Sequence, residues 1–129
     1  MAEINKSIEV RVEDIGKNGF VFMRLIARVA VGGREWTAST SISVMLRNDK
    51  VIITMVCTKN GCRKHSNEMS VEEFAGWLQR KGNEMLDRLD RLYVSTFTSL
   101  LTLYESLKKK GIDIKFGDQD LNSWPNQPL

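Results

Sequence analysis

The first half of the chain alternates apolar and polar residues with a period of two, as strands with one buried face do. The alternation begins at residues 8–13, and the turn dipeptide Asn18-Gly19 follows it. Further alternating segments lie on either side of Gly32-Gly33 and of Asn48-Asp49, which are also two-residue turn signals. The pattern predicts a four-stranded antiparallel meander over residues 8–58.

The turn at Gly32-Gly33 also predicts which residues face each other across the second hairpin. It sets two pairs of residues opposite each other: Val29 with Trp36, and Val21 with Val44. Directly opposed residues point to the same face of a sheet, so the apolar positions of the two strands coincide. This agreement favours the register, because a slip of one residue would turn every apolar side chain of one strand to the polar face.

The other two turns predict further pairings. The Asn48-Asp49 turn sets Ile42 opposite Met55. The Asn18-Gly19 turn pairs three residues from each strand of the first hairpin: Val12 with Leu25, Glu13 with Arg24, and Glu9 with Arg28. Two of these pairs join opposite charges, which favours the register.

The second half of the chain has the apolar spacing of a helix. Ser70 followed by Glu73 matches a capping box, a typical helix start, and Gly111 after three lysines is a typical end. Gly82 interrupts the pattern, either as a kink in one helix or as a break between two. The predicted fold class is therefore α+β: a four-stranded antiparallel meander followed by one long helix or two consecutive C-terminal helices over residues 70–111.

The composition predicts one domain. A length of 129 residues is enough for a hydrophobic core, and 42% apolar with 27% charged residues is typical of globular proteins. The domain is expected to cover residues 1–116, with the sheet over residues 8–58, a basic loop over residues 59–69 and the helical part over residues 70–111. Residues 117–129 are polar and contain two prolines, so we expect a flexible tail.

One side of the predicted helix repeats every seven residues, as the seam of a coiled coil does. Six residues of this repeat form the expected dimerisation seam: Leu86, Leu89, Tyr93, Leu100, Leu103 and Leu107. The seam predicts self-association through the C-terminal helix. An amphipathic helix lying on its own sheet repeats at nearly the same interval, so the pattern also fits an intramolecular core.

The sheet face opposite the predicted core carries aromatic and cationic side chains. Four of them share this face of one strand: Phe20, Phe22, Arg24 and Arg28. Rings stack on unpaired bases and guanidinium groups contact phosphates, so the set is typical of a surface for single-stranded nucleic acid. Trp36 is a further aromatic candidate, but its register points it into the core. Alternatively, the tail, the helix or a second subunit covers this face.

Three cations of the predicted basic loop could extend such a surface. Lys59, Arg63 and Lys64 lie close together in the chain, beside the flexible Gly61. They suit phosphate contacts, and they equally suit a solvated loop. The net charge of +3 permits an anionic partner without requiring one.

No residue pattern is typical of an enzyme or of a metal site. Cys57, Cys62 and His65 are spaced like metal ligands, but a structural zinc site has four protein ligands and no fourth follows. His65 is the only histidine, and no nucleophile has an evident general base. No phosphate-binding glycine motif precedes a helix. We therefore expect no enzymatic activity, no cofactor and no metal.

The chain is expected to be cytoplasmic. Its apolar runs are too short to span a bilayer, and its first residues lack the pattern of a signal peptide. Two cysteines are too few for a disulfide scaffold, and a reducing compartment would keep both as thiols.

The order of elements resembles the archaeal ThermoDBP family: a four-stranded meander, a basic loop, and a long helix with the seven-residue repeat from Leu86 to Leu107. The resemblance covers residues from about Ile8 to Gly111 and rests on architecture. Members of that family bind single-stranded DNA or RNA and associate through their C-terminal helical part. The resemblance and the sheet face together predict a sequence-tolerant, homo-oligomeric binder of single-stranded nucleic acid. The alternative is a protein-interaction or assembly module without a nucleic-acid role.

Overall fold

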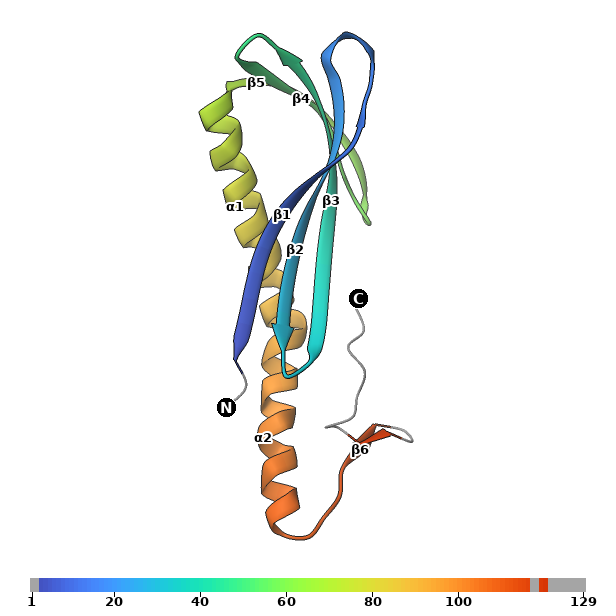
Figure 1. The fold of residues 1–129 in the computed structure, drawn as a ribbon, viewed down its shortest axis with the longest axis vertical. Coiled ribbons are helices and arrows are strands. Elements are labelled where there is room, and N and C mark those ends of the chain that lie inside the picture. Colours follow the sequence, from blue (N-terminus) through green and yellow to red (C-terminus); the bar gives the residue numbers. More distant parts are fainter. Residues whose placement is uncertain (1–2, 117–118, 121–129) are drawn as a thin grey trace.

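The computed structural model describes residues 3–116 and 119–120. The fold is α+β, with an antiparallel sheet in the order β1-β2-β3-β4-β5 followed by a long helical segment (Figure 1). The strands of the sheet are β1 (Ile4–Ile15), β2 (Phe20–Val31), β3 (Arg34–Arg47), β4 (Lys50–Thr58) and β5 (Gly61–Ser70). The helical segment consists of α1 (Val71–Leu89), a π-helical turn η2 (Asp90–Val94) and α2 (Ser95–Lys109). A short 3₁₀ turn, η1 (Lys17–Gly19), joins β1 to β2.

The sheet has five strands, so the prediction of four is wrong by one. The segment expected to be a basic loop, residues 59–69, contains β5, which pairs with β4 along its length. A tight turn makes this possible, because Thr58 lies directly opposite Gly61. The strand escaped detection because it is an edge strand with polar residues on both faces, and charged side chains are typical of such edges.

The predicted pairing of β2 with β3 is confirmed in full, including Val29 opposite Trp36 and Val21 opposite Val44. The pairing of β3 with β4 is confirmed only from the turn at Asn48-Asp49 back to Val44. A bulge after Ser43 sets Ile42 opposite Val56, so the predicted partner Met55 is wrong. Because a bulge adds one residue to one strand, every position beyond it changes face.

The first hairpin differs from its predicted register by two residues. Val12 lies opposite Met23 and not Leu25, because the η1 turn and a bulge after Val12 take up additional residues. From Ile4 to Val12 this shift of two leaves each side chain on its expected face, whereas Asp14 and Ile15, beyond the bulge, are shifted by one and change face. The two predicted ion pairs therefore still form, diagonally across the strands: the Glu13 and Arg24 side chains lie 3.1 Å apart, and those of Glu9 and Arg28 lie 2.7 Å apart.

The helical segment begins as predicted. Ser70 accepts a hydrogen bond from the Glu73 N–H at 3.1 Å, and the Glu73 carboxylate accepts one from the Ser70 N–H at 3.2 Å. Gly82 is neither a kink nor a break, since α1 is continuous through it and packs there against Ile8. The helix is irregular further on, at η2, where Lys6 pairs with Asp90 at 3.0 Å.

One face of the sheet packs against α1, η2 and the start of α2, and we call this the inner face. The core contains the inner-face residues of β2, β3 and β4, together with six side chains of the helical segment: Phe74, Met85, Leu86, Leu89, Val94 and Phe97. Figure 1 shows that α2 continues beyond the end of the sheet. We call the opposite face of the sheet the outer face.

The last described residues form a two-residue hairpin, β6 (Lys115–Phe116) with β7 (Gln119–Asp120). The rest of the predicted flexible tail, residues 117–118 and 121–129, lies outside the described residues. Within residues 3–116 and 119–120, no helix is both long and apolar enough to cross a membrane.

Candidate nucleic-acid interface

The outer face carries the four residues of β2 that the sequence assigned to it. Phe20, Phe22, Arg24 and Arg28 alternate with the core residues of the same strand. Phe22 is 42% exposed, and Phe20 is half-buried. Ile26, between the two arginines, is only 6% exposed. On the outer face, Phe22 is thus accessible to solvent, whereas Ile26 is covered by its neighbours.

A band of apolar side chains crosses the outer face beside Phe22. The strand pairings place Phe22, Ser43, Met55 and Lys64 in one row across β2 to β5. The next row contains Phe20, Met45, Ile52 and Glu68. The apolar members of both rows are half-buried or exposed. The band therefore presents rings and thioethers to solvent, with the Lys64 ammonium at its edge.

The arginines of the outer face form ion pairs with β1. Arg24 pairs with Glu13, while Glu9 accepts hydrogen bonds from both Arg28 at 2.7 Å and Arg11 at 3.0 Å. These hydrogen bonds, that from Arg28 above all, hold the pKa of the Glu9 carboxyl below its usual value. Exposed ion pairs contribute little net stability, because water and salt screen them. This applies to the exposed pair of Arg24 with Glu13, whereas the pair of Arg28 with Glu9 is partly buried.

The three cations of the predicted basic loop lie on different sides of the hairpin formed by β4 and β5. Lys64 lies on the outer face, because it is opposite Met55. Arg63 is opposite the core residue Val56, so it lies on the inner side. Lys59 is in the turn between the strands. The hairpin therefore does not present these residues as one patch.

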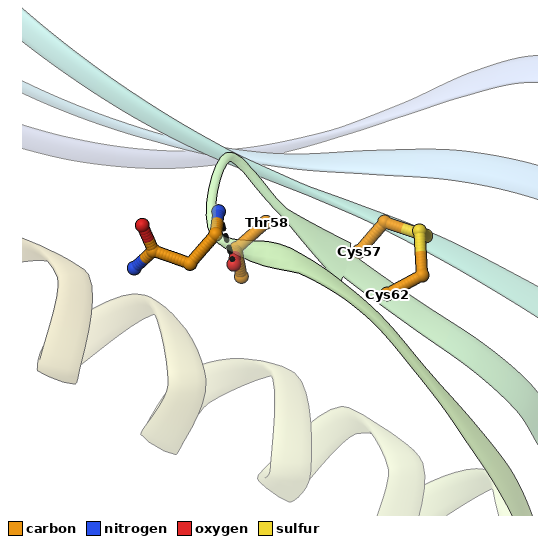
Figure 2. Close-up of a disulfide and its surroundings, with 4 residues drawn as sticks. Cys57, Thr58 and Cys62 are labelled. Atoms are coloured by element: carbon orange, nitrogen blue, oxygen red, sulfur yellow. Dashed lines mark hydrogen bonds between the residues drawn. A yellow bond between two sulfur atoms is a disulfide. The ribbon is translucent and has the colours of Figure 1, made fainter.

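Cys57 and Cys62 form a disulfide across this hairpin, so the prediction of two thiols is wrong. The predicted pairing of Met55 with Ile42 would have turned Cys57, two residues further on, toward the core; the bulge in β4 turns it to the outer face, directly opposite Cys62. Figure 2 shows the disulfide on the side of the hairpin turned away from the helix, next to Thr58. Thr58 Oγ1 accepts a hydrogen bond from the Asn60 N–H at 3.2 Å. The disulfide thus holds the base of the turn that carries Lys59, and the hydrogen bond between Asn60 and Thr58 holds the turn itself.

A cleft of about 490 Å³ lies beside β3, where the hairpin of β4 and β5 ends. β4 pairs with β3 only from Ser41 onward, whereas β3 begins at Arg34. The turn between β4 and β5 closes one end of the cleft, and the helical segment forms a wall. Three cations line the cleft: Arg24, Lys59 and Arg88. Three apolar or aromatic side chains of the helical segment line it too: Met85, Leu92 and Tyr93.

The cleft was not predicted from the sequence. Arg88 has the spacing of a solvated helix face, and Tyr93 fits the seven-residue repeat, so neither indicates a site by its pattern. In the structure, Tyr93 is 37% exposed, and its ring stacks on Trp36 with the ring centres 6.3 Å apart. Trp36 itself is buried in the core, as its register predicted. The site depends on where the helix passes the end of β4.

The expected dimerisation seam is divided by the structure. Leu86 and Leu89 are buried in the core beneath the sheet, so in this arrangement they are not exposed for a partner. Tyr93 lines the cleft. On α2, Leu100 and Leu107 are half-buried and Leu103 is 48% exposed. Of the seam, Leu103 and Tyr93 are thus exposed, Leu100 and Leu107 are half-buried, and Leu86 and Leu89 are buried.

The residues that suggested a metal site do not form one. Both cysteines are in the disulfide, and the described residues contain no cluster of three or more His, Cys, Asp or Glu side chains that could hold a metal ion.

Comparisons of the chain with protein-family models, with curated proteins and with solved structures find no match. The resemblance to the ThermoDBP family thus stays a hypothesis that rests on architecture.

Proposed function

We propose that this protein binds single-stranded nucleic acid on the outer face of its sheet, with little preference for sequence. The observation that carries the proposal is the exposed ring of Phe22, which lies on one face with Arg24, two residues away, and with Lys64, in the same row. An exposed ring flanked by cations provides both contacts that a single strand needs. Bases stack on the ring, and phosphates approach the cations.

The sheet explains why the binding would tolerate different sequences. Every base has a stacking face, so a ring such as Phe22 accepts any of them. The polar residues next to it on β3 are serines, among them Ser41 and Ser43, which are short and can donate or accept hydrogen bonds. Sequence-specific readout requires side chains that reach the edges of bases in a fixed geometry. The arginines here are held by carboxylates of β1, so we expect them to contact phosphates and not base edges.

Replacing Phe22 by leucine tests the proposal, because leucine keeps an apolar side chain and removes the ring. A stacked base contributes roughly 1–3 kcal/mol, so we expect the affinity for an oligothymidylate to fall about tenfold or more. Phe22→Trp should retain or strengthen binding. Fluorescence anisotropy of a labelled oligonucleotide at two salt concentrations measures both variants, and affinity should fall as salt rises.

Val71→Ala serves as the control, since Val71 is an exposed apolar residue at the start of α1. It should bind like the wild type. The proposal fails if the wild-type protein does not bind the oligonucleotide at low salt, or if Phe22→Leu and Val71→Ala bind equally well.

We also propose that the protein self-associates through α2. Phe97 is the only residue of this helix that is buried, while Leu103 is exposed at heptad spacing from Leu100 and Leu107. Leu103→Lys is expected to shift the molecular mass measured by light scattering from an oligomer to a monomer. Thr102→Lys, on the neighbouring exposed position, adds the same charge and should leave the mass unchanged.

A monomeric wild-type protein would contradict this second proposal. An oligomer that binds no nucleic acid would instead favour the alternative function, an assembly module that uses the same helix.

A further inference from the structure

We infer that the cleft beside β3 holds one nucleotide of the bound strand, with its phosphate among Arg24, Lys59 and Arg88 and its base against the wall formed by Leu92 and Tyr93. This inference rests on the proposed function, and it adds a second, concave contact to the open outer face.

The charge of the cleft points to an anion. Its three cations come from three separate elements: Arg24 from β2, Lys59 from the turn between β4 and β5, and Arg88 from α1. None of the described residues that line the cleft is acidic. Cations gathered in a concave site reinforce one another's potential and attract an anion more strongly than the same charges spread over a flat surface.

Two of these cations are also available for a ligand. Arg24 already pairs with Glu13. For Arg88 and Lys59, the described part of the chain provides no ion pair within 4.0 Å. A phosphate in the cleft would therefore meet two side chains that lose no carboxylate partner when they bind it.

The size and the walls of the cleft suit a nucleotide. Its volume of about 490 Å³ falls within the roughly 300–1,000 Å³ of small-molecule sites. Met85, Leu92 and Tyr93 provide apolar surface for a base, and Ser39 and Thr58 add hydroxyl groups to the lining. The Tyr93 ring is held parallel to Trp36, with only 5° between the ring planes. A held ring loses little freedom when a base contacts it.

The cleft also opens onto the outer face. Arg24 and Ser41 lie directly opposite each other on the outer face, and both line the cleft. Phe22 is two residues from Arg24 along β2, which is about 7 Å in a strand. A strand stacked on Phe22 can therefore reach the cleft with its next nucleotides, and the Cys57–Cys62 disulfide holds the base of the turn that carries Lys59.

The experiment compares two arginines of the helical segment. Arg88→Ala removes a cation of the cleft, whereas Arg91→Ala removes an exposed cation three residues away that does not line it. We expect Arg88→Ala to weaken binding of an oligothymidylate about fivefold and to lower the slope of log affinity against log salt by about 0.7, the value for one phosphate contact of a single strand. Arg91→Ala should change neither quantity appreciably.

Trp36 offers a second readout, because it stacks on Tyr93 behind the cleft wall. In a variant with Trp77 and Trp124 replaced by phenylalanine, thymidine monophosphate and the oligothymidylate are each expected to change Trp36 fluorescence, and Arg88→Ala is expected to move the midpoint of each titration to about fivefold higher ligand concentration. Circular dichroism of each variant shows that the fold is kept.

The outcomes separate the two proposals. If Phe22→Leu weakens binding while Arg88→Ala behaves like Arg91→Ala, the cleft is not part of the interface and the outer-face proposal stands. If the wild type binds no oligonucleotide, the proposed function itself fails. If an acidic peptide changes Trp36 fluorescence and neither nucleotide probe does, the cleft serves a protein partner and the inference is overturned.

Discussion

Trp36→Ala is expected to lower the free energy of unfolding by about 3–5 kcal/mol, the usual cost of truncating a buried Trp or Phe. Trp36 is 4% exposed on β3 and joins the sheet to the helical segment. Its ring contacts Phe97 edge-on, with the centres 5.2 Å apart, and stacks on Tyr93. The substitution removes the contacts that hold the end of η2 and the start of α2 against the sheet.

Urea denaturation followed by circular dichroism measures this loss, at a fixed protein concentration because any self-association would add to stability. Trp36→Phe should lose less, since it keeps a ring in the core. Trp77→Ala is the matched control: Trp77 is half-buried and stacks on Phe74 at 6.0 Å, so its loss should be smaller. Equal losses for Trp36→Ala and Trp77→Ala would contradict the central position of Trp36.

Gly82→Val is expected to destabilise the protein by about 2–3 kcal/mol, as overpacking does. A Cβ atom at Gly82 would lie 2.7 Å from Ile8 Cδ1 and 2.9 Å from Ile8 Cγ2, both of which are too close for carbon atoms. The helix passes β1 at this point, and the absence of a side chain at Gly82 leaves the space that the Ile8 side chain fills. The clash outweighs the gain in helix propensity, which is under about 1 kcal/mol.

Gly76→Val provides a direct comparison on the same helix. The nearest neighbour of a Cβ at Gly76 is the Arg80 Nη1 atom at 3.4 Å, which can move aside. This variant should therefore be as stable as the wild type or slightly more stable. Adding Ile8→Ala to Gly82→Val should recover part of the lost stability, because it removes the clashing atoms. If Gly82→Val and Gly76→Val have equal stabilities, the close approach of β1 is not what requires glycine at position 82.

The proposed interface depends on both local and long-range features of the chain. Alternation along β2 was enough to place Phe22 and Arg24 on one face, because side-chain direction in a strand follows from its period of two. The cleft could not be found in this way. Arg24, Lys59 and Arg88 are far apart in sequence and carry no shared pattern; they meet only because the helix passes the end of β4.

Several features were determined by the sequence itself, because their causes lie within a few residues. The glycine turn after Val31 set the register of β2 with β3. The capping box at Ser70 set the start of α1, since both of its hydrogen bonds span three residues. The periodicity of the two halves determined the α+β class and the side of the sheet that became the core.

Other features were decided only by the tertiary structure, because they depend on elements that are distant in sequence. The bulge in β4 turned Val56 inward, where it is buried, and turned Cys57 outward, where it forms a disulfide with Cys62. The pairing of β5 gave a polar segment its strand conformation at the edge of the sheet. Packing of α1 on the sheet buried Leu86 in the core, so that this part of the predicted seam is not exposed. Alternation and turn signals describe one segment at a time, whereas packing selects among the arrangements that all segments allow together.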